Sequence, residues 1–194
     1  MKKSSVLTMI IALAIAGTAQ AGFINPADVP SAAPFTCEFT NPVNSHEWDF
    51  DYSMPTLTMN EIIGAVAADN VLIRGQTDSD PVFTVIKTIT NTSGVTWTGY
   101  TLTLAGSGIP TFVAGSAGAG GVKLQNVAYP HPAAIVFSGN NPVHNGELLT
   151  LQFDINVPTT GLFDFSLTQH PVPEPTTICL LGLGSLALFK KRRS

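Results

Sequence analysis

Positive charge is scarce in this 194-residue chain outside its two ends. Of the nine Lys and Arg residues, two lie at positions 2–3 and four at positions 190–193, which leaves Arg74, Lys87 and Lys123 in between. Twelve of the 13 acidic residues fall in the same central region, so its net charge is near −9. Because nucleic-acid binding depends on a basic surface that neutralises phosphates, this charge excludes a nucleic-acid-binding protein. It also disfavours contact with anionic membranes.

Cysteine is scarce as well, with two residues in the whole chain. Cys37 lies in the central region, whereas Cys179 lies in an apolar run near the C-terminus. The two are not expected to pair, because that run is predicted below to enter a membrane. We therefore expect Cys37 to be a buried free thiol, since free cysteine packs as a small apolar residue.

Recognised catalytic motifs are missing too. The sequence has no Gly-x-Ser-x-Gly elbow, and its glycine-rich stretch 115–121 lacks the Gly-Lys-Ser/Thr of a phosphate loop. The histidines do not have metal-ligand spacing, so surface or loop positions are expected for all four: His46, His131, His144 and His170. These absences predict a protein that is not an enzyme and needs no cofactor.

The first 21 residues have the three parts of a secretory signal peptide. Lys2 and Lys3 form a basic start, residues 6–16 are apolar, and Ala19 and Ala21 fit a small-x-small cleavage site. The sequence thus predicts export across the inner membrane through the secretion translocon, followed by cleavage by signal peptidase. The mature chain would begin at Gly22.

The last 23 residues, 172–194, have a different organisation. Residues 172–175 read Val-Pro-Glu-Pro, and the two prolines prevent a helix from running through this junction. The apolar span 176–189 would form a helix of about 21 Å, which is short of a ~30 Å hydrocarbon core. A basic cluster follows at 190–193. Snorkelling of these basic side chains and local thinning of the bilayer would allow a short membrane anchor with its basic end in the cytoplasm.

This tail closely resembles the PEP-CTERM sorting signal. The matching parts are Pro173-Glu174-Pro175, the span 176–189, and the basic stop, which consists of Lys190, Lys191, Arg192 and Arg193. The resemblance implies an exported protein of a bacterium with an exopolysaccharide envelope, whose tail is recognised and processed by the membrane protease exosortase. It covers about an eighth of the chain and implies no catalytic residue. An ordinary tail anchor with a proline linker is the alternative.

The region between the two ends has the alternation of β-strands. The clearest runs are 47–52, 149–157 and 163–167, in which every second residue is apolar. Residues 82–90 are rich in β-branched residues on both faces, as expected of a central strand. The turn-forming residues 91–94 suggest that this strand forms a hairpin with residues 95–104.

Other segments are less regular. The apolar phase slips at Gly99, as in a β-bulge. Residues 22–40 predict an irregular lead-in with one short edge strand. Residues 56–66 fit one or two strands broken at Asn60-Glu61, and the alternative is a short helix over 61–68. Further short strands are expected at 71–74, 122–128 and 133–138, and residues 139–142 have the composition of a turn.

Seven to nine short strands without a long amphipathic helix predict an all-β fold. We expect an antiparallel β-sandwich, of the immunoglobulin-like kind, over residues 22–171. The signal-peptide helix 1–21 would precede it, and the sorting segment 172–194 with its short hydrophobic helix would follow.

An acidic row at Glu47, Asp49 and Asp51 is one candidate for chemistry. Alternate residues on a strand lie about 6.6 Å apart, a separation that would suit the carboxylate pair of an inverting glycosidase. However, an exposed row gives no reason for the raised pKa that a general acid needs. The alternative interpretation, which we favour, is a solvated strand face that protects a sheet edge.

A calcium site is a second candidate. Asp78 and Asp80, with Asp69 nearby in sequence, offer hard oxygen ligands of the kind that calcium prefers. The spacing lacks the full EF-hand pattern, and an Asx-turn or a strand cap explains the same residues without metal.

Taken together, these features predict a non-enzymatic exported protein. The tail would hold it at the inner membrane until exosortase processes it, and the sandwich would then join the cell surface or an exopolysaccharide biofilm matrix. One alternative is a carbohydrate-binding module, which would need an exposed platform of Trp48, Trp97 and Tyr100. The other is a glycan-acting enzyme, which would need a cleft that brings two acids together.

Overall fold

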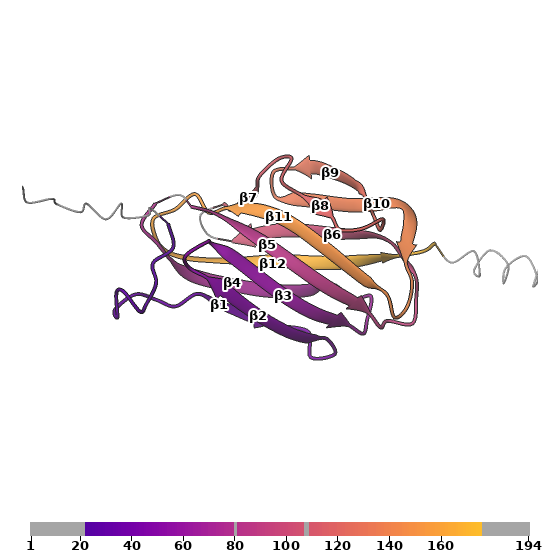
Figure 1. The fold of residues 1–194 in the computed structure, drawn as a ribbon, viewed down its shortest axis with the longest axis horizontal. Coiled ribbons are helices and arrows are strands. Elements are labelled where there is room, and N and C mark those ends of the chain that lie inside the picture. Colours follow the sequence, from indigo (N-terminus) through magenta and orange to yellow (C-terminus); the bar gives the residue numbers. More distant parts are fainter. Residues whose placement is uncertain (1–21, 80, 107–108, 176–194) are drawn as a thin grey trace, which may run out of the picture.

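The computed structural model describes residues 22–79, 81–106 and 109–175. In these ranges the chain forms twelve β-strands in two sheets that face each other (Figure 1). An all-β sandwich is therefore confirmed, whereas the immunoglobulin-like topology stays a prediction. Within the described ranges no helix has the length and apolar character to cross a membrane. The helices predicted at 1–21 and 176–189 lie outside the described residues.

The first sheet has the order β1-β4-β12-β6-β10-β9, and each neighbouring pair is antiparallel. Its strands are β1 (Thr36–Phe39), β4 (Asp69–Thr77), β12 (Gly161–Pro173), β6 (Trp97–Gly106), β10 (Ala134–Val143) and β9 (Asn126–His131). The thirteen-residue β12 is the longest strand and runs through the middle of the sheet. At about 3.3 Å per residue it spans about 40 Å.

The second sheet has the order β2-β3-β5-β11-β7, and β8 pairs separately with β11. Its strands are β2 (Ser45–Asp51), β3 (Thr56–Ile63), β5 (Val82–Asn91), β11 (Leu148–Asn156), β7 (Thr111–Phe112) and β8 (Gly118–Ala119). One pair, β3 with β5, is parallel, so the sandwich is mixed rather than purely antiparallel. The parallel pairing follows from the connection between the two strands, because β4 crosses to the first sheet before β5 returns.

The predicted hairpin between residues 82–90 and 95–104 is wrong. β5 pairs with β3 and β11, whereas β6 lies in the opposite sheet between β12 and β10. The turn residues instead form hydrogen bonds around Asn91. Asn91 Nδ2 donates to Val95 O at 2.8 Å and to Val143 O at 3.0 Å. Asn91 Oδ1 accepts from Ser93 N at 3.0 Å. This buried asparagine fixes a corner where the chain changes sheets.

The β-bulge expected at Gly99 is confirmed. Val172 on β12 lies opposite Gly99, but the next residue, Pro173, lies opposite Trp97, so Thr98 is an extra residue on β6. As a result Trp97 and Tyr100 both face the core although they are three positions apart. The bulge lies beside the end of β12, where the folded chain approaches the sorting segment.

Several boundaries differ from the expectation. Residues 56–63 form one continuous strand, so the helix alternative for this segment is wrong. Residues 139–142, predicted as a turn, belong to β10, although β10 loses register with β6 between Ser138 and Val143. The final strand extends beyond the predicted 163–167 to Pro173.

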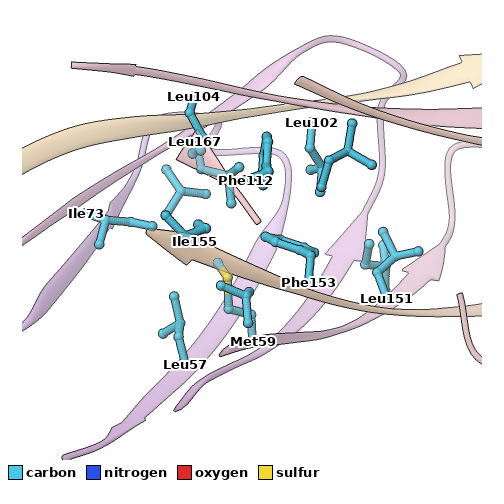
Figure 2. Close-up of a cluster of buried hydrophobic side chains, with 14 of the residues drawn as sticks. Leu57, Met59, Ile73, Leu102, Leu104, Phe112, Leu151, Phe153, Ile155 and Leu167 are labelled. Carbon is cyan, nitrogen blue, oxygen red and sulfur yellow. The ribbon is translucent and has the colours of Figure 1, made fainter. Parts of the chain in front are cut away.

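The core lies between the two sheets and contains buried side chains from both of them. Figure 2 shows Met59 and Leu57 of β3 and Phe153 of β11 directed toward side chains of the first sheet such as Leu102 and Leu167. A cluster of phenylalanine rings closes one end of the core; in it the rings of Phe35 and Phe50 stack at 3.8 Å. These contacts hold the strands that carry the polar groups described next.

Candidate functional sites: the end of β12 and a buried ionic cluster

The folded domain extends into the Pro-Glu-Pro motif. Pro173 is the last residue of β12 and lies opposite Trp97. Glu174 N then donates to Thr96 O at 2.9 Å, so the backbone of the motif is bonded to the chain just before β6. The side chains of Glu174 and Pro175 are exposed. The motif is therefore presented at the surface by the last strand, with no flexible linker between it and the core.

The other predicted parts of the targeting signals lie outside the described residues. They are the cleavage-site residues Ala19 and Ala21, the apolar span 176–189 and the basic stop 190–193. Of the sorting segment the structure describes residues 172–175, and at the other end its first described residue is Gly22.

Polar and charged side chains also form a cluster inside the sandwich, in the half where β12 ends. We call it the ionic cluster; it consists of Asn44, His46, Glu61, Asp69 and Lys87. Lys87 of β5 and Glu61 of β3 form an ion pair in which both side chains have no exposed surface. The Lys87 ammonium also contacts Met59 Sδ at 3.5 Å.

His46 connects the two carboxylates of the ionic cluster. Its Nδ1 lies 3.7 Å from Glu61 Oε1, and its Nε2 lies 3.1 Å from Asp69 Oδ2. The imidazole stacks on Phe39 with ring centroids 3.9 Å apart, which fixes its orientation. Asp69 also accepts hydrogen bonds from Asn44 Nδ2 at 2.9 Å and from Asn41 N at 3.2 Å. The cluster thus joins β2 and β3 of one sheet to β4 of the other.

The charges in the ionic cluster balance. Burial alone would lower the pKa of His46, but the contacts with Asp69 and Glu61 outweigh burial and raise this pKa to about 9. Burial raises the pKa of Glu61, yet Lys87 and His46 hold it below its usual range. Burial also raises the pKa of the Asp69 carboxyl, but the contact with His46 holds this pKa below its usual range. Two cations therefore face two carboxylates at neutral pH.

Four buried polar atoms in or near the cluster form no hydrogen bond in the described part of the chain: both ring nitrogens of His46, Glu61 Oε2 and Gln169 Nε2. The two His46 nitrogens still lie within ion-pair distance of Glu61 and Asp69. Gln169 uses its other polar atom, since Tyr100 Oη donates to Gln169 Oε1 at 2.7 Å. Burial and the negative charges of Glu61 and Asp69 raise the pKa of Tyr100 well above its ordinary value, so this phenol stays protonated. An unpaired buried carboxylate oxygen is costly and needs an explanation.

The acidic row predicted on β2 faces outward. Glu47 and Asp49 are exposed, and Asp51 accepts hydrogen bonds from Ser53 N at 2.8 Å and Ser53 Oγ at 2.7 Å. These hydrogen bonds hold the pKa of Asp51 below its usual range, the opposite of what a general acid requires. The row belongs to an edge strand, as the solvated-face interpretation expects.

The three aspartates considered for calcium do not come together. Asp69 is at the first residue of β4 inside the ionic cluster, whereas Asp78 follows the opposite end of β4 and accepts from Gly22 N at 2.6 Å. Asp80 lies outside the described residues. In the ranges that the structure describes, no group of three or more His, Cys, Asp or Glu side chains is placed to hold a metal ion.

The aromatic residues considered for a sugar platform differ in how far they are buried. Trp97 and Tyr100 have no exposed surface, whereas Trp48 on the edge strand β2 is 37% exposed. Cys37 is a buried free thiol, as predicted, and burial raises its pKa to about 12.

The prediction of surface positions for the histidines is right for His131, His144 and His170, which are exposed, but wrong for His46. The alternation of inward and outward positions along the strands could have predicted the ionic cluster from the sequence. Lys87 has the same parity as Val85 and Ile89 on β5, and Glu61 has the parity of the buried residues of β3. A charged residue at an inward position on each of two strands was the available signal.

Comparisons with known proteins give one match. Neither a curated protein nor a solved structure matches the chain significantly. Residues 171–193 match the PEP-CTERM protein-sorting motif, which agrees with the tail resemblance and includes the end of β12. This motif implies export, transient anchoring in the membrane and processing by an exosortase. The chain therefore carries the signal of a PEP-CTERM protein, an exosortase-sorted secreted protein.

Proposed function

We propose that the sandwich is a non-catalytic structural component of the cell surface or of an exopolysaccharide matrix, delivered there by exosortase processing. The observation that carries this proposal is the direct passage of β12 from the core into Pro173-Glu174-Pro175. The side chains of Glu174 and Pro175 are exposed for recognition, while the backbone up to Glu174 is held by the fold. Processing beyond Pro175 would release the sandwich with all its strands intact.

Charge supports the same assignment. A mature region near −9 is repelled by anionic membrane surfaces after release, so nothing in its composition would retain it at the bilayer. Its outward acidic row on β2 protects a sheet edge from pairing with other chains. A protein with these properties would remain dispersed until a specific partner captures it.

The carbohydrate-binding alternative is weakened by burial. With Trp97 and Tyr100 inside the core, only Trp48 of the three proposed platform residues is available, and sugar stacking there would rest on one partly exposed ring. The enzymatic alternative depended on the acidic row, whose members face solvent on an edge strand.

The experiment is the intact mass of the protein recovered separately from the envelope and the medium of the native host. We expect a species that begins at Gly22 and ends close to Pro175, with or without a C-terminal adduct. Glu174→Gln should leave unprocessed chain in the membrane fraction. Glu47→Gln, which changes an equally exposed glutamate outside the motif, should be processed normally. Wild-type protein that still ends at Ser194 in every fraction would refute the proposal.

A further inference from the structure

We propose that Lys87 and Glu61 are a modification site at which the two side chains condense into an amide that ties β5 to β3, with His46 carrying the protons. The pair has the contact and the isolation from water that such a reaction needs. Lys87 Nζ touches Glu61 Oε1, and neither side chain has exposed surface. Groups held in contact in one orientation react as if at very high concentration, because the entropy of bringing them together has already been lost on folding.

The ion pair leaves several hydrogen-bonding groups unused, and an amide would have fewer of them. An ammonium group has three N–H donors, yet among the described residues Lys87 Nζ contacts one oxygen, Glu61 Oε1, and one weakly accepting sulfur, Met59 Sδ. Glu61 Oε2 has no hydrogen-bond partner in the same part of the chain. An amide has one N–H donor, so condensation removes two of the three ammonium donors and both charges of the pair. Glu61 Oε2 then becomes the oxygen of a neutral amide instead of an unpaired carboxylate oxygen. A buried charge pair is costly to keep out of water, which favours its conversion.

The reaction balances without any co-reactant. The Lys87 ammonium gives up a proton, and the neutral Nζ attacks Glu61 Cδ and forms the Nζ–Cδ bond. The Cδ–Oε1 bond then breaks, and Oε1 leaves as water with two protons that came from the ammonium. The ammonium and the carboxylate become one neutral amide and one water, and no atom is oxidised or reduced.

His46 is the group placed to move these protons. Its Nδ1 lies 3.7 Å from Glu61 Oε1, the leaving oxygen, and its Nε2 lies 3.1 Å from Asp69 Oδ2. Because His46 is protonated at neutral pH, it can deliver its Nδ1 proton to the departing oxygen and then recover the proton that the attacking amine releases. Asp69 keeps the ring oriented, and stacking on Phe39 keeps it in place.

The position of the amide suits a protein that is held by its C-terminus. β3 and β5 are the parallel pair in the second sheet, and they are joined in sequence through β4 of the first sheet. A bond from residue 61 to residue 87 would close this excursion into a covalent loop that contains β4. Because β4 is paired along β12, the loop would secure the neighbour of the strand that leads to Pro173.

Tryptic mapping of the denatured full-length protein tests the proposal. Arg74, Lys87 and Lys123 are the basic residues between positions 4 and 189, so an unmodified chain yields peptides 75–87 and 88–123. Condensation blocks cleavage after Lys87. We therefore expect peptide 75–123 joined to the peptide that ends at Arg74, with a total mass lower by one water molecule.

The same digest contains its own control. Lys123 and Glu147 form an ion pair at 2.6 Å between the same two residue types, but these side chains are 23% and 38% exposed. We expect normal cleavage after Lys123, because a solvated pair loses the driving force of burial. Lys87→Met and Glu61→Ala should each remove the branched species and restore unlinked peptides.

His46→Gln separates a chemical role from a structural one. If His46 carries protons, refolded variant protein should form the branched peptide about 100-fold more slowly than wild type while its near-ultraviolet circular dichroism remains native. Equal rates in the two folded proteins would overturn the role of His46. Peptides 75–87 and 88–123 in full yield from folded wild-type protein would overturn the proposal itself. Processing by exosortase is measured at Pro175 and is independent of either result.

Discussion

Replacement of Asp69 by asparagine should destabilise the sandwich far more than the loss of an exposed carboxylate. Asp69 is 1% exposed, and its two oxygens accept hydrogen bonds from Asn44 Nδ2 and Asn41 N. His46 Nε2 lies 3.1 Å from Asp69 Oδ2. An asparagine has the same shape, but it removes the negative charge and replaces one acceptor oxygen by an NH₂ donor. The perturbation therefore leaves a charged His46 without its nearest carboxylate.

The expected loss of stability is about the same whether it is taken from buried ion pairs in general or from the pKa of His46. Breaking a buried ion pair by removing one partner typically costs about 3–5 kcal/mol. Independently, contacts with Asp69 and Glu61 raise the pKa of His46 from 6.5 to about 9, and a shift of that size corresponds to about 3 kcal/mol in total. Since Asp69 supplies the shorter contact, we expect Asp69→Asn to cost about 2–4 kcal/mol of unfolding free energy at pH 7.

Urea denaturation of Asp69→Asn and wild type measures this difference. The matched control is Glu38→Gln, because Glu38 pairs with Arg74 at 2.8 Å on the surface, where the side chains are 61% and 44% exposed. Exposed pairs contribute about 1 kcal/mol or less. If the two variants lose equal stability, the ionic cluster does not hold the two sheets together and the reasoning is refuted.

The contacts of His46 with Asp69 and Glu61 also determine whether the stability of the fold rises or falls with pH. A folded pKa above the unfolded value means that the contribution of protonated His46 is fully present below pH 6.5 and is lost as the pH rises through about 9. The wild-type melting temperature should therefore fall between about pH 7 and pH 10, more steeply than that of Asp69→Asn. Parallel curves for the two proteins would show that His46 does not titrate in this window.

Three further predictions concern individual residues of the sandwich. Tyr100→Phe should cost about 1–3 kcal/mol in urea denaturation, because its buried glutamine partner loses its hydrogen bond; an unchanged midpoint would contradict this. Gly106→Ala should destabilise more than Gly94→Ala: both glycines have positive φ, but only at Gly106 would a Cβ lie 2.5 Å from a backbone atom, Cα of Phe165. Cys37 should react with a thiol reagent only after unfolding, because burial raises its pKa to about 12; rapid labelling of native protein would disprove its burial.

Alternation along the chain was enough to predict the fold class and most strands. The runs at 149–157 and 163–167 became β11 and part of β12, because a period of two on a half-buried strand has one structural meaning. The bulge at Gly99 was also readable, since the apolar phase changes there. These features are local and depend on which face of a strand is buried.

Strand pairing was harder to predict from the sequence, as the wrong hairpin between residues 82–90 and 95–104 shows. Residues 91–94 have turn chemistry, but a turn does not determine whether the next strand returns beside its predecessor or crosses to the facing sheet. Here the buried Asn91 donates to Val95 O and Val143 O, and the Val143 contact is contributed by a residue 52 positions away. No local pattern contains that partner. The ionic cluster was missed for a related reason, because its four charged members come from four different strands.

The structure also assigns a consequence to signal-peptide cleavage. Gly22 N donates to Asp78 Oδ1 at 2.6 Å, and Asp78 N donates to Gly22 O at 3.0 Å. While residue 21 is attached, this donor is a neutral amide; cleavage before Gly22 converts it into an α-ammonium group. A hydrogen bond from a charged donor to a carboxylate is roughly twice as strong as a neutral one, so cleavage should tighten the lead-in against the end of β4.

Protein that begins at Gly22 should therefore be more stable than protein that retains Ala21, by about 1 kcal/mol at pH 6 in urea denaturation. The difference should shrink above about pH 8, where an α-amino group of ordinary pKa loses its charge. Asp78→Asn should abolish it, whereas Asp49→Asn, on an exposed strand face, should leave it unchanged. If both chain starts are equally stable at pH 6, the new terminus does not pair with Asp78. If they differ as expected, removal of the signal peptide completes the fold at the end of β4 opposite the ionic cluster, about 40 Å along β12 from the sorting motif.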